Sequence, residues 1–345
     1  RGTSAAFYNS GTWAAYGPVD RIASNNAIIG MTSVGSWEQT QETSAPANTA
    51  FKTSFKTNLW ASTQVSMPTA GRVGISYSIE AQDLQLLKFG TSEAETLTLG
   101  FWIKGTFTGT YNINFKNDDA SREVNAQYTI SVADTWEHKT VNIPADTSGA
   151  FTNDNGKGLT IIWIMSTGAD LATGTSPTAW GSIVNANYNA GSTNNNYAST
   201  INDNFNITGI QLEVGTYSST TLPPFQHESY GDSLLRCQRY YFSNFPVANM
   251  PYGSGVVNGT TNARATFTFP QTMRTNASLS RRHYDDFKVY CGATNVDCTV
   301  FSFYYMNEKQ TLMYADVASG LTDGQGCLII DDATGVGFIA GHAEL

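Results

Sequence analysis

Apolar and polar residues alternate along most of the chain, in short segments separated by glycine, proline and asparagine. Alternation with a period of two is typical of a β-strand with one buried face. Residues 111–115, 128–132 and 206–214 show it most clearly, whereas residues 159–164 are almost continuously apolar, as in a strand covered on both faces. Many short strands at this spacing predict a β-sandwich or jelly roll.

Two segments interrupt the β pattern. Residues 81–87 fit either a turn of helix or a bulged crossover. Residues 229–238 predict a helix more clearly, because Ser229 can cap its start and apolar residues recur near helical spacing. The preceding Leu-Pro-Pro-Phe step at 222–225 predicts a stiff, extended connection.

Tryptophan and cysteine occupy different parts of the chain. All seven tryptophans lie before residue 181 and all four cysteines after residue 236, which predicts two modules with different cores. We expect an all-β chain: a jelly-roll β-sandwich over residues 1–228, a short linking helix over 229–240, and a second, smaller β-sandwich over 241–345. Because the chain begins with Arg1 rather than Met, we expect it to be part of a longer sequence.

Composition excludes several classes of function. Only 14% of the residues are charged and the formal charge is −9, against about 25% charged residues in an average domain. A nucleic-acid-binding protein is expected to carry a basic patch, so we expect no nucleic-acid partner. The longest apolar run, residues 159–165, is far shorter than the roughly 18 residues of a membrane-spanning helix, so we expect no membrane insertion. No signal peptide is recognisable.

The cysteines show no spacing typical of a zinc site. Buried free thiols are the favoured interpretation, because unpaired cysteine packs as a small hydrophobic residue. A disulfide between Cys291 and Cys298 stays open.

The sequence contains no arrangement typical of catalysis. It has no G-x-S-x-G motif and no phosphate-binding loop, and none of its four histidines has the spacing of a zinc site. Adjacent carboxylates such as Asp118 and Asp119 point to opposite faces of a strand, so they make poor acid–base pairs. We therefore expect no enzyme and no cofactor. Loops rich in Asp and Asn leave a structural calcium ion open.

Sugar recognition fits the composition better, because it needs flat aromatic faces and short polar side chains but little net charge. Residues 185–206 contain nine asparagines and predict a long solvated loop. Trp180, Tyr188, Asn195 and Tyr197 lie in or beside this stretch and are the candidate glycan-binding residues. The alternative for the aromatic residues is core packing, which is the commoner role of Trp and Tyr in β proteins.

Three segments in the middle of the chain resemble a block found in tail-fibre and other virion proteins of double-stranded DNA bacteriophages. They are ITGIQLEVG at 207–215, LPPFQHESYG at 222–231 and LLRCQRYY at 234–241. The opening Arg-Gly-Thr-Ser, the Val-Asp-Arg at 19–21, the Phe-Pro-Gln-Thr-Met-Arg-Thr at 269–275 and the final Ala-Glu-Leu are similar to that family as well. The tryptophan that usually follows the Asp-Arg pair in the family is missing here.

The resemblance implies a carbohydrate-binding-module-like jelly roll, with the start of its first strand upstream of Arg1, followed by a small C-terminal β domain, on the exterior of a virion. It implies attachment to host-surface polysaccharide by a tail fibre or receptor-binding subunit, contact with other virion proteins, and assembly as a homotrimer. A capsid fibre, decoration or neck appendage protein with a purely structural role is the alternative. A depolymerising enzyme is the weakest of the three hypotheses, because no paired carboxylates stand out.

Overall fold

In the computed structural model of the chain, the described residues are 6–8, 15–16, 21–24, 36–61, 67–193, 202–244, 247–292, 294–332 and 334–345. The chain divides into two compact units. The first comprises Arg1–His227 with Leu345, and the second comprises Glu228–Glu344. The division falls one residue before the boundary expected from the sequence.

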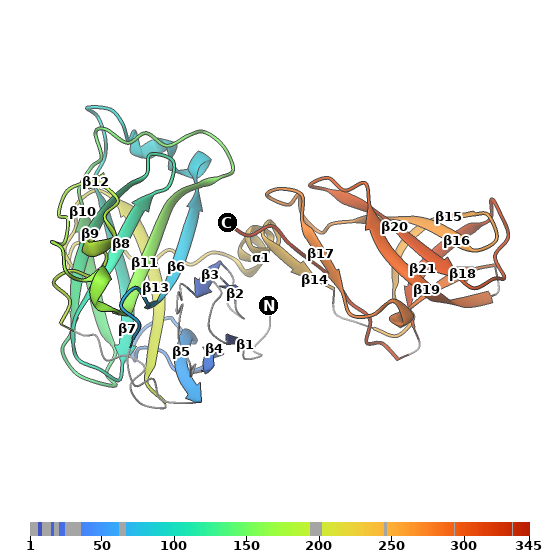
Figure 1. Cartoon of the computed structure of the whole chain (residues 1–345), viewed down its shortest axis with the longest axis horizontal. Coiled ribbons are helices and arrows are strands. Elements are labelled where there is room, and N and C mark those ends of the chain that lie inside the picture. Colours follow the sequence, from blue (N-terminus) through green and yellow to red (C-terminus); the bar gives the residue numbers. More distant parts are fainter. Residues whose placement is uncertain are drawn as a thin grey trace. The chain divides into compact units, whose positions relative to one another are not determined.

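The first domain contains two antiparallel sheets (Figure 1). Sheet A has the strand order β1 (Ala6–Tyr8), β4 (Ser36–Glu42), β5 (Ser54–Ala61), β13 (Asn204–Val214), β7 (Leu97–Gly105) and β10 (Glu137–Ile143). Sheet B has the order β12 (Gly181–Ser182), β9 (Arg122–Ile130), β8 (Gly109–Asn117), β11 (Lys157–Thr167), β6 (Arg72–Glu80), β3 (Ile22–Ser24) and β2 (Ala15–Tyr16). Three short 3-10 helices, η1 (Ala81–Leu87), η2 (Ala169–Leu171) and η3 (Asn185–Asn187), lie between the strands.

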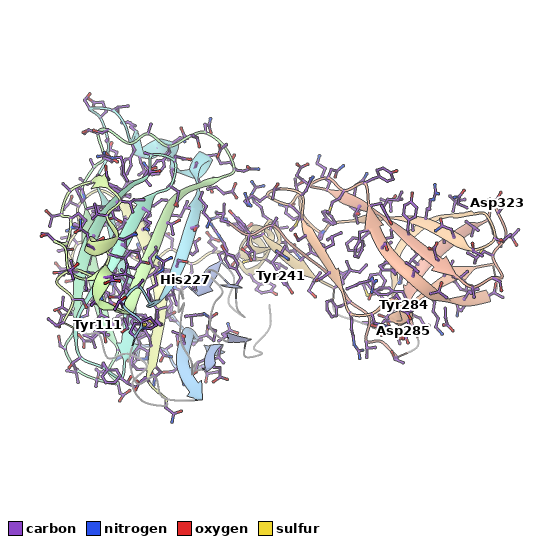
Figure 2. All side chains as sticks on the ribbon, viewed as in Figure 1. Tyr111, His227, Tyr241, Tyr284, Asp285 and Asp323 are labelled. Carbon is purple, nitrogen blue, oxygen red and sulfur yellow. The ribbon has the colours of Figure 1, made fainter. Side chains whose placement is uncertain are left out.

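The core lies between the two sheets. Phe101 of β7 and Trp163 of β11 are almost fully buried and meet edge to face, with their ring centroids 5.9 Å apart. Tyr111 of β8, labelled in Figure 2, lies in the same core. Its ring stacks on that of Tyr128 of β9. Alternate residues of each strand supply this core, as the period of two predicts. The all-β class is confirmed.

Strand β11 is covered on both faces, as its continuous apolar run predicts. Its outward residues Ile162 and Ile164 are buried against Leu171 and Tyr188, which belong to the segment 168–193. This segment packs on the outward face of sheet B.

Amide side chains of sheet B hold the segment 168–193 in place. The Nδ2 of Asn112 donates to the carbonyl of Ala190 at 2.9 Å, and the Nδ2 of Asn125 donates to the carbonyl of Asn187 at 2.9 Å. Ala190 is fully buried and Asn189 is 1% exposed. The expectation of a solvated loop is therefore wrong for residues 188–190, because the sheet satisfies the backbone groups that water would otherwise bind, whereas Asn185, Gly191 and Thr193 are exposed.

The second domain begins with helix α1 (Tyr230–Gln238), which confirms the predicted helix. The hydroxyl of Ser229 accepts from the backbone N–H of Asp232 at 3.2 Å and caps the helix start, as the sequence predicts. No described residue of the chain belongs to a helix that is both long and apolar enough to cross a membrane.

Six strands of the second domain close into a barrel: β15 (Pro251–Asn258), β16 (Asn262–Thr268), β20 (Gln310–Val317), β19 (Thr294–Tyr304), β18 (Phe287–Cys291) and β21 (Gly326–Asp331). Beside it, β14 (Tyr241–Ser243), β22 (Ile339–His342) and β17 (Ser278–Arg281) form a three-stranded sheet, and the 3-10 turn η4 (Tyr284–Asp286) precedes β18. Phe287 and Phe301 stack at the barrel centre with ring centroids 4.3 Å apart. Closure of the sheet is a detail that the strand pattern does not predict.

Candidate functional site

Two of the four predicted glycan-binding residues are sealed inside the first domain. Trp180 is 9% exposed; its Nε1 donates to the carbonyl of Pro144 at 2.7 Å, and its ring meets Phe89 edge to face. Tyr188 is 3% exposed, between the cationic groups of Arg72 and Lys116 at 5.1 and 5.2 Å from its ring centroid. Neither residue has an open ring face, so the expectation of exposed platforms here is wrong.

The burial of Tyr188 has an electrostatic consequence. Removal from water raises the pKa of its hydroxyl to about 12, so the ring stays neutral beside the two cations. The other two predicted residues, Asn195 and Tyr197, lie in the segment 194–201, outside the described residues, and their role stays a prediction.

The outward face of sheet A carries the aromatic residues that the packing leaves partly open. Because Phe101 and Ile103 of β7 are fully buried, alternation turns Trp102 away from the core, where it is half-buried. Trp102 lies opposite His138 of β10 in the strand register, and the two ring centroids are 5.1 Å apart. Burial lowers the pKa of His138, so the imidazole is neutral at neutral pH.

A second indole lies beside the first. Trp136, just before β10, is also half-buried, and the Nζ of Lys104 lies 5.4 Å from its ring centroid. Lys104 is two residues from Trp102 on β7, so both side chains leave the same face of sheet A. Its Nζ lies 3.0 Å from the Oγ of Ser44, which holds the ammonium group in place.

Polar groups of β4, β5 and β13 complete this face. Asn206 lies opposite Lys104 on one neighbouring strand and opposite Lys56 on the other. Its Nδ2 donates to Glu42 at 2.9 Å and to Ser54 at 3.3 Å, and the Nζ of Lys56 lies 3.2 Å from Glu42. Burial works to raise the pKa of Glu42, but the hydrogen bonds from Asn206 and Lys56 and the charges of Lys56 and Lys104 hold it below its ordinary value.

Two amide oxygens in the floor of this face have unused hydrogen-bonding capacity. The Oδ1 atoms of Asn206 and Asn58 are buried and have no hydrogen-bond partner among the described residues. Asn206 leaves the outward side of sheet A, because its strand neighbours Phe205 and Ile207 face the core. Asn58 leaves the same side, because it lies opposite Asn204, two residues from Asn206. Both oxygens are buried beneath the face, so a ligand hydroxyl would reach these unsaturated acceptors only if the side chains above them moved aside.

The segment 222–227 crosses one end of the same face; we call it the strap. The Nε2 of Gln211 donates to the carbonyl of Pro223 at 3.0 Å, and a Cβ on Gly100 would lie 2.4 Å from Leu222. Gly100 therefore makes room for the strap on β7. The Leu-Pro-Pro-Phe step is held against the sheet by the same block of residues that carries the family resemblance.

Aromatic contacts hold the end of the strap. The rings of Phe225 and His227 lie 4.9 and 5.6 Å from the ring of Phe51 (His227 is labelled in Figure 2). Phe51 covers Gly209, where the backbone of β13 bulges at a φ of +60°. The strap and the residues around Phe51 thus cover one end of the outward face and leave Trp102 and Trp136 beside them.

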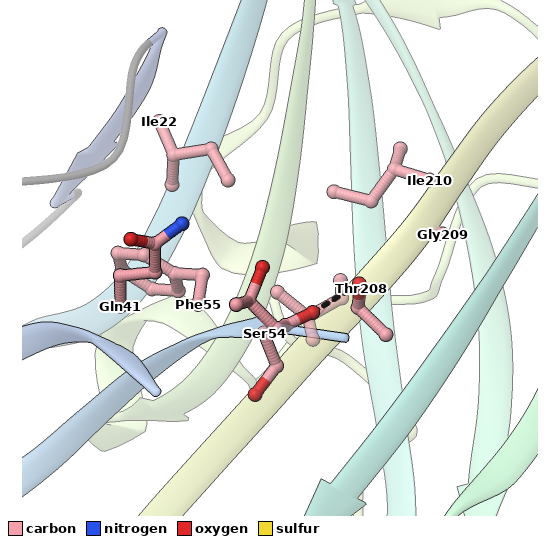
Figure 3. Close-up of a pocket in the computed structure, with 9 residues that line it drawn as sticks. Ile22, Gln41, Ser54, Phe55, Thr208, Gly209 and Ile210 are labelled. Carbon is pink, nitrogen blue, oxygen red and sulfur yellow. Dashed lines mark hydrogen bonds between the residues drawn. The ribbon is translucent and has the colours of Figure 1, made fainter. Parts of the chain in front are cut away.

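A pocket of about 210 Å³ opens between β3, β4, β5 and the bulge of β13 (Figure 3). Its walls include the core side chains Ile22, Phe55 and Ile207, with the side chain of Gln41 and the hydroxyl of Thr208 as polar groups. The Thr208 hydroxyl is already used, since it donates to the carbonyl of Thr53 at 2.9 Å. Thr53 and Ser54 also line the pocket, but its aromatic residue, Phe55, is only 3% exposed. The pocket therefore offers no open ring face to a sugar, and the outward face of sheet A is the better candidate.

The described side chains of this face form no cluster of His, Cys, Asp and Glu that could bind a metal ion. Among the described residues, no group of three or more His, Cys, Asp and Glu side chains is placed to bind one. Asn side chains and backbone carbonyl groups also bind calcium, so the calcium ion that the sequence leaves open stays a prediction.

The sequence contains a signal for the two indoles that the loop-based prediction missed. Residues 100–105 read Gly-Phe-Trp-Ile-Lys-Gly, so an inward Phe101 and Ile103 require an outward Trp102 and Lys104. The position of Trp102 in an alternating strand predicts an outward side chain. The composition of residues 185–206, by contrast, does not show which other residues cover them.

Comparison with known proteins gives only distant likenesses. No protein-family model matches the chain, and no curated protein matches it. Among solved structures, the enzymatically active domain of tailspike protein 4 of bacteriophage CBA120 is 13% identical, with a TM-score of 0.31, over 56% of this chain and 19% of that one. A family 16 carbohydrate-binding module is 14% identical, with a TM-score of 0.24, over 51% of this chain and 84% of the module.

The family 11 carbohydrate-binding module of a cellulosomal cellulase of Clostridium thermocellum is 12% identical, with a TM-score of 0.24. That likeness covers 61% of this chain and 88% of the module. The chain spans about a fifth of the tailspike chain. All of these TM-scores are low, so the likenesses carry no conclusion about activity.

Proposed function

We propose that the first domain binds host-surface polysaccharide on the outward face of sheet A, and that the chain is a tail-fibre or receptor-binding subunit on the exterior of a phage virion. The observation that carries the binding proposal is the pair of half-buried indoles, Trp102 and Trp136, beside amide oxygens with no partner. Indole faces stack on the C–H groups of sugar rings, and spare amide acceptors bind hydroxyl groups. The virion assignment rests on the sequence resemblance at residues 207–241.

We propose that this face binds the polysaccharide without cleaving it. A glycosidase needs a carboxylic acid with a raised pKa to protonate the leaving oxygen. Glu42 has the opposite property, because Lys56 and Asn206 hold its pKa below the ordinary value. Incubation with host polysaccharide should leave the viscosity of the polymer unchanged; a fall in viscosity would contradict a purely binding role.

Binding can be tested on a glycan array and on host cells with the soluble protein. Trp102→Ala and Trp136→Ala should each weaken binding about tenfold or more, equivalent to about 1.4 kcal/mol, because each removes a stacking surface. Tyr290→Ala is a matched control, since Tyr290 is 41% exposed but lies in the second domain. The control should bind as strongly as the wild type.

Failure of the wild-type protein to bind any glycan or host cell would overturn the receptor proposal. Binding that survives both tryptophan substitutions but is lost in Tyr197→Ala would keep the function and move the site to the asparagine-rich stretch. Near-ultraviolet circular dichroism of each variant shows whether the fold is intact.

A structural role in the virion is the second candidate, and the second domain supports it. Tyr304 and Tyr305 at the end of β19 are 51% and 82% exposed, and Val300 on the same strand is 46% exposed. Exposed aromatic and aliphatic side chains of this kind are suited to contact with another virion protein or with a second copy in a homotrimer. Light scattering of the purified chain tests the trimer, and antibody labelling of intact particles tests the exterior location.

A further inference from the structure

Two cysteines face each other across neighbouring strands of the barrel in the second domain. In the register of β18 with β21, Cys291 lies directly opposite Cys327. Alternation directs both side chains into the barrel, where they are 4% and 6% exposed and belong to the same hydrophobic cluster. Two inward pairs, Val289 with Ile329 and Phe287 with Asp331, follow them along the same two strands.

The register places this pair within reach of a covalent bond. Directly opposite residues of antiparallel strands have their Cα atoms about 4.5 Å or about 5.5 Å apart, depending on the hydrogen-bonding class of the pair. Disulfides span Cα separations of about 4.4–6.8 Å. Both classes of pair therefore fall within the disulfide range, with no movement of either strand.

The alternative pairing that the sequence left open is excluded by the same register. Cys291 lies opposite Thr294 of β19, and Cys298 is four residues further along that strand, about 13 Å away at about 3.3 Å per residue. Such a separation is far beyond the roughly 7 Å limit for a disulfide. Cys237 is on helix α1, outside the barrel.

The position of the pair explains how a buried thiol can react. Cys291 is the last residue of β18 and Cys327 is the second residue of β21, next to turns at Gly292 and Gly324 with positive φ. Strand ends open locally more often than strand centres. Burial, and then the proximity of Cys291, raises the pKa of the Cys327 thiol to about 11, so the reactive thiolate is scarce in the closed barrel.

We propose that Cys291 and Cys327 form a cross-strand disulfide when the protein meets an oxidised low-molecular-weight thiol such as glutathione disulfide. The thiolate of one cysteine attacks a sulfur of glutathione disulfide, which forms a mixed disulfide and releases one glutathione thiolate. The thiolate of the other cysteine then attacks the protein-side sulfur and releases a second glutathione thiolate. The two cysteine protons pass to the two glutathione molecules, so the protein loses two hydrogen atoms and glutathione disulfide is reduced.

The bond would tie β18 to β21 at one end of the barrel without disturbing the register. A reducing cell interior would keep the two thiols apart, and an oxidising exterior would join them. The inference is independent of the glycan proposal, because it concerns only the barrel.

Peptide mapping of the full chain tests the proposal. The protein is incubated with glutathione disulfide, and in parallel refolded in a mixture of oxidised and reduced glutathione, then alkylated, digested without reductant and analysed by mass spectrometry. We expect a linked peptide pair that contains Cys291 and Cys327, with Cys298 alkylated. Alkylation of both Cys291 and Cys327 in the native and the refolded protein would overturn the proposal, as would a link from Cys291 to any other cysteine.

Cys298→Ser is the matched control, because it removes a buried barrel thiol that lies outside the pair. It should keep the linked peptide, whereas Cys327→Ser should leave Cys291 alkylated. Oxidised wild type and Cys298→Ser should unfold several degrees lower when dithiothreitol is added. The same loss in Cys327→Ser would contradict the pairing. If that variant does not fold, the peptide map of Cys298→Ser decides alone.

Discussion

Replacement of Asp331 by asparagine should stabilise the second domain at neutral pH. Asp331 is fully buried at the end of β21, and its Oδ1 has no hydrogen-bond partner among the described residues. Burial first, and then the charges of Asp332 and Asp286, raise the pKa of Asp331, against the hydrogen bonds from Tyr252 and from the backbone of Gly337. Ionisation of the Asp331 carboxylate in the apolar barrel therefore lowers the stability of the folded second domain.

The hydrogen-bond geometry around Asp331 favours its protonated form. The hydroxyl of Tyr252 lies 3.0 Å from Oδ2 of Asp331 and 2.7 Å from the carbonyl oxygen of Gly337. One hydroxyl proton cannot serve both acceptors. A protonated Asp331 can donate to the Tyr252 oxygen while Tyr252 donates to Gly337. The Nδ2 group of an asparagine can do the same at any pH.

The sign of the pH dependence follows from the raised pKa. The folded state binds a proton at Asp331 that the unfolded state has already lost above about pH 3.9, so stability falls as pH rises through the raised folded pKa. Asp331→Asn removes that slope. The variant should match the wild type near pH 4 and exceed it at pH 7 by about 1–3 kcal/mol, the cost of leaving a buried polar group unsatisfied. For a domain of this size that is a rise in Tm of roughly 4 °C or more.

Calorimetry across pH 4 to 8 measures the effect on the second domain, and tryptophan emission provides an internal control. All seven tryptophans lie before residue 181, so emission follows only the first domain and should not shift. Asp332→Asn is the matched variant, and its effect on the stability of the second domain should have the opposite sign. Hydrogen bonds from Thr334, with the charge of Lys288, outweigh burial and lower the pKa of Asp332, so its loss should destabilise the domain at neutral pH. A destabilised Asp331→Asn at pH 7, or an unchanged pH slope, would refute the reasoning.

Three further substitutions test the packing. Gly209→Ala should destabilise the first domain by about 1–2 kcal/mol, because φ is +60° and the new Cβ would lie 2.6 Å from the ring of Phe51; an unchanged tryptophan-emission midpoint would contradict this. Phe287→Ala should lower the stability of the second domain by about 3–5 kcal/mol in calorimetry, because the Phe287 ring is fully buried. A loss below about 1 kcal/mol, the size typical of a surface substitution, would contradict this and show that the cavity collapses. Glu42→Gln should cost the first domain under about 1 kcal/mol at pH 7, since the ion pair with Lys56 is partly exposed. That cost should vanish in acid, as pH falls through the lowered pKa of Glu42, and a cost that persists there would contradict it.

The strands were predictable because each has one face that must be buried. The alternating segments at 111–115 and 206–214 form the strands β8 and β13, and the apolar run at 159–164 is covered on both faces, as expected. Helix α1 was predictable from local signals alone, since its cap is a contact within four residues. Local pattern is enough for such elements, whereas closure of the barrel depends on a pairing of β15 with β21, far apart along the chain.

The candidate site was harder to predict because the composition of a segment does not determine whether other parts of the chain cover it. Asparagine-rich sequence normally indicates a loop in water, but amide side chains can also replace water as partners of backbone groups. Asn112 and Asn125 do this for the segment 168–193, which carries Trp180 and Tyr188 into the interior. No local signal distinguishes a chain segment that meets such partners from one that does not.

Asparagine therefore plays a different role on each of the two sheets, depending on which residues cover it. On sheet B the amides lie under the segment 168–193, and Tyr188 is sealed between two cations. On sheet A, Asn58 and Asn206 lie in the floor of a face where Trp102 and Trp136 stay half-open and the strap covers only one end. An unsaturated acceptor beneath a packed segment can only destabilise the fold. On sheet A the half-buried indoles Trp102 and Trp136 keep accessible surface above such acceptors, which is why the binding proposal belongs to sheet A.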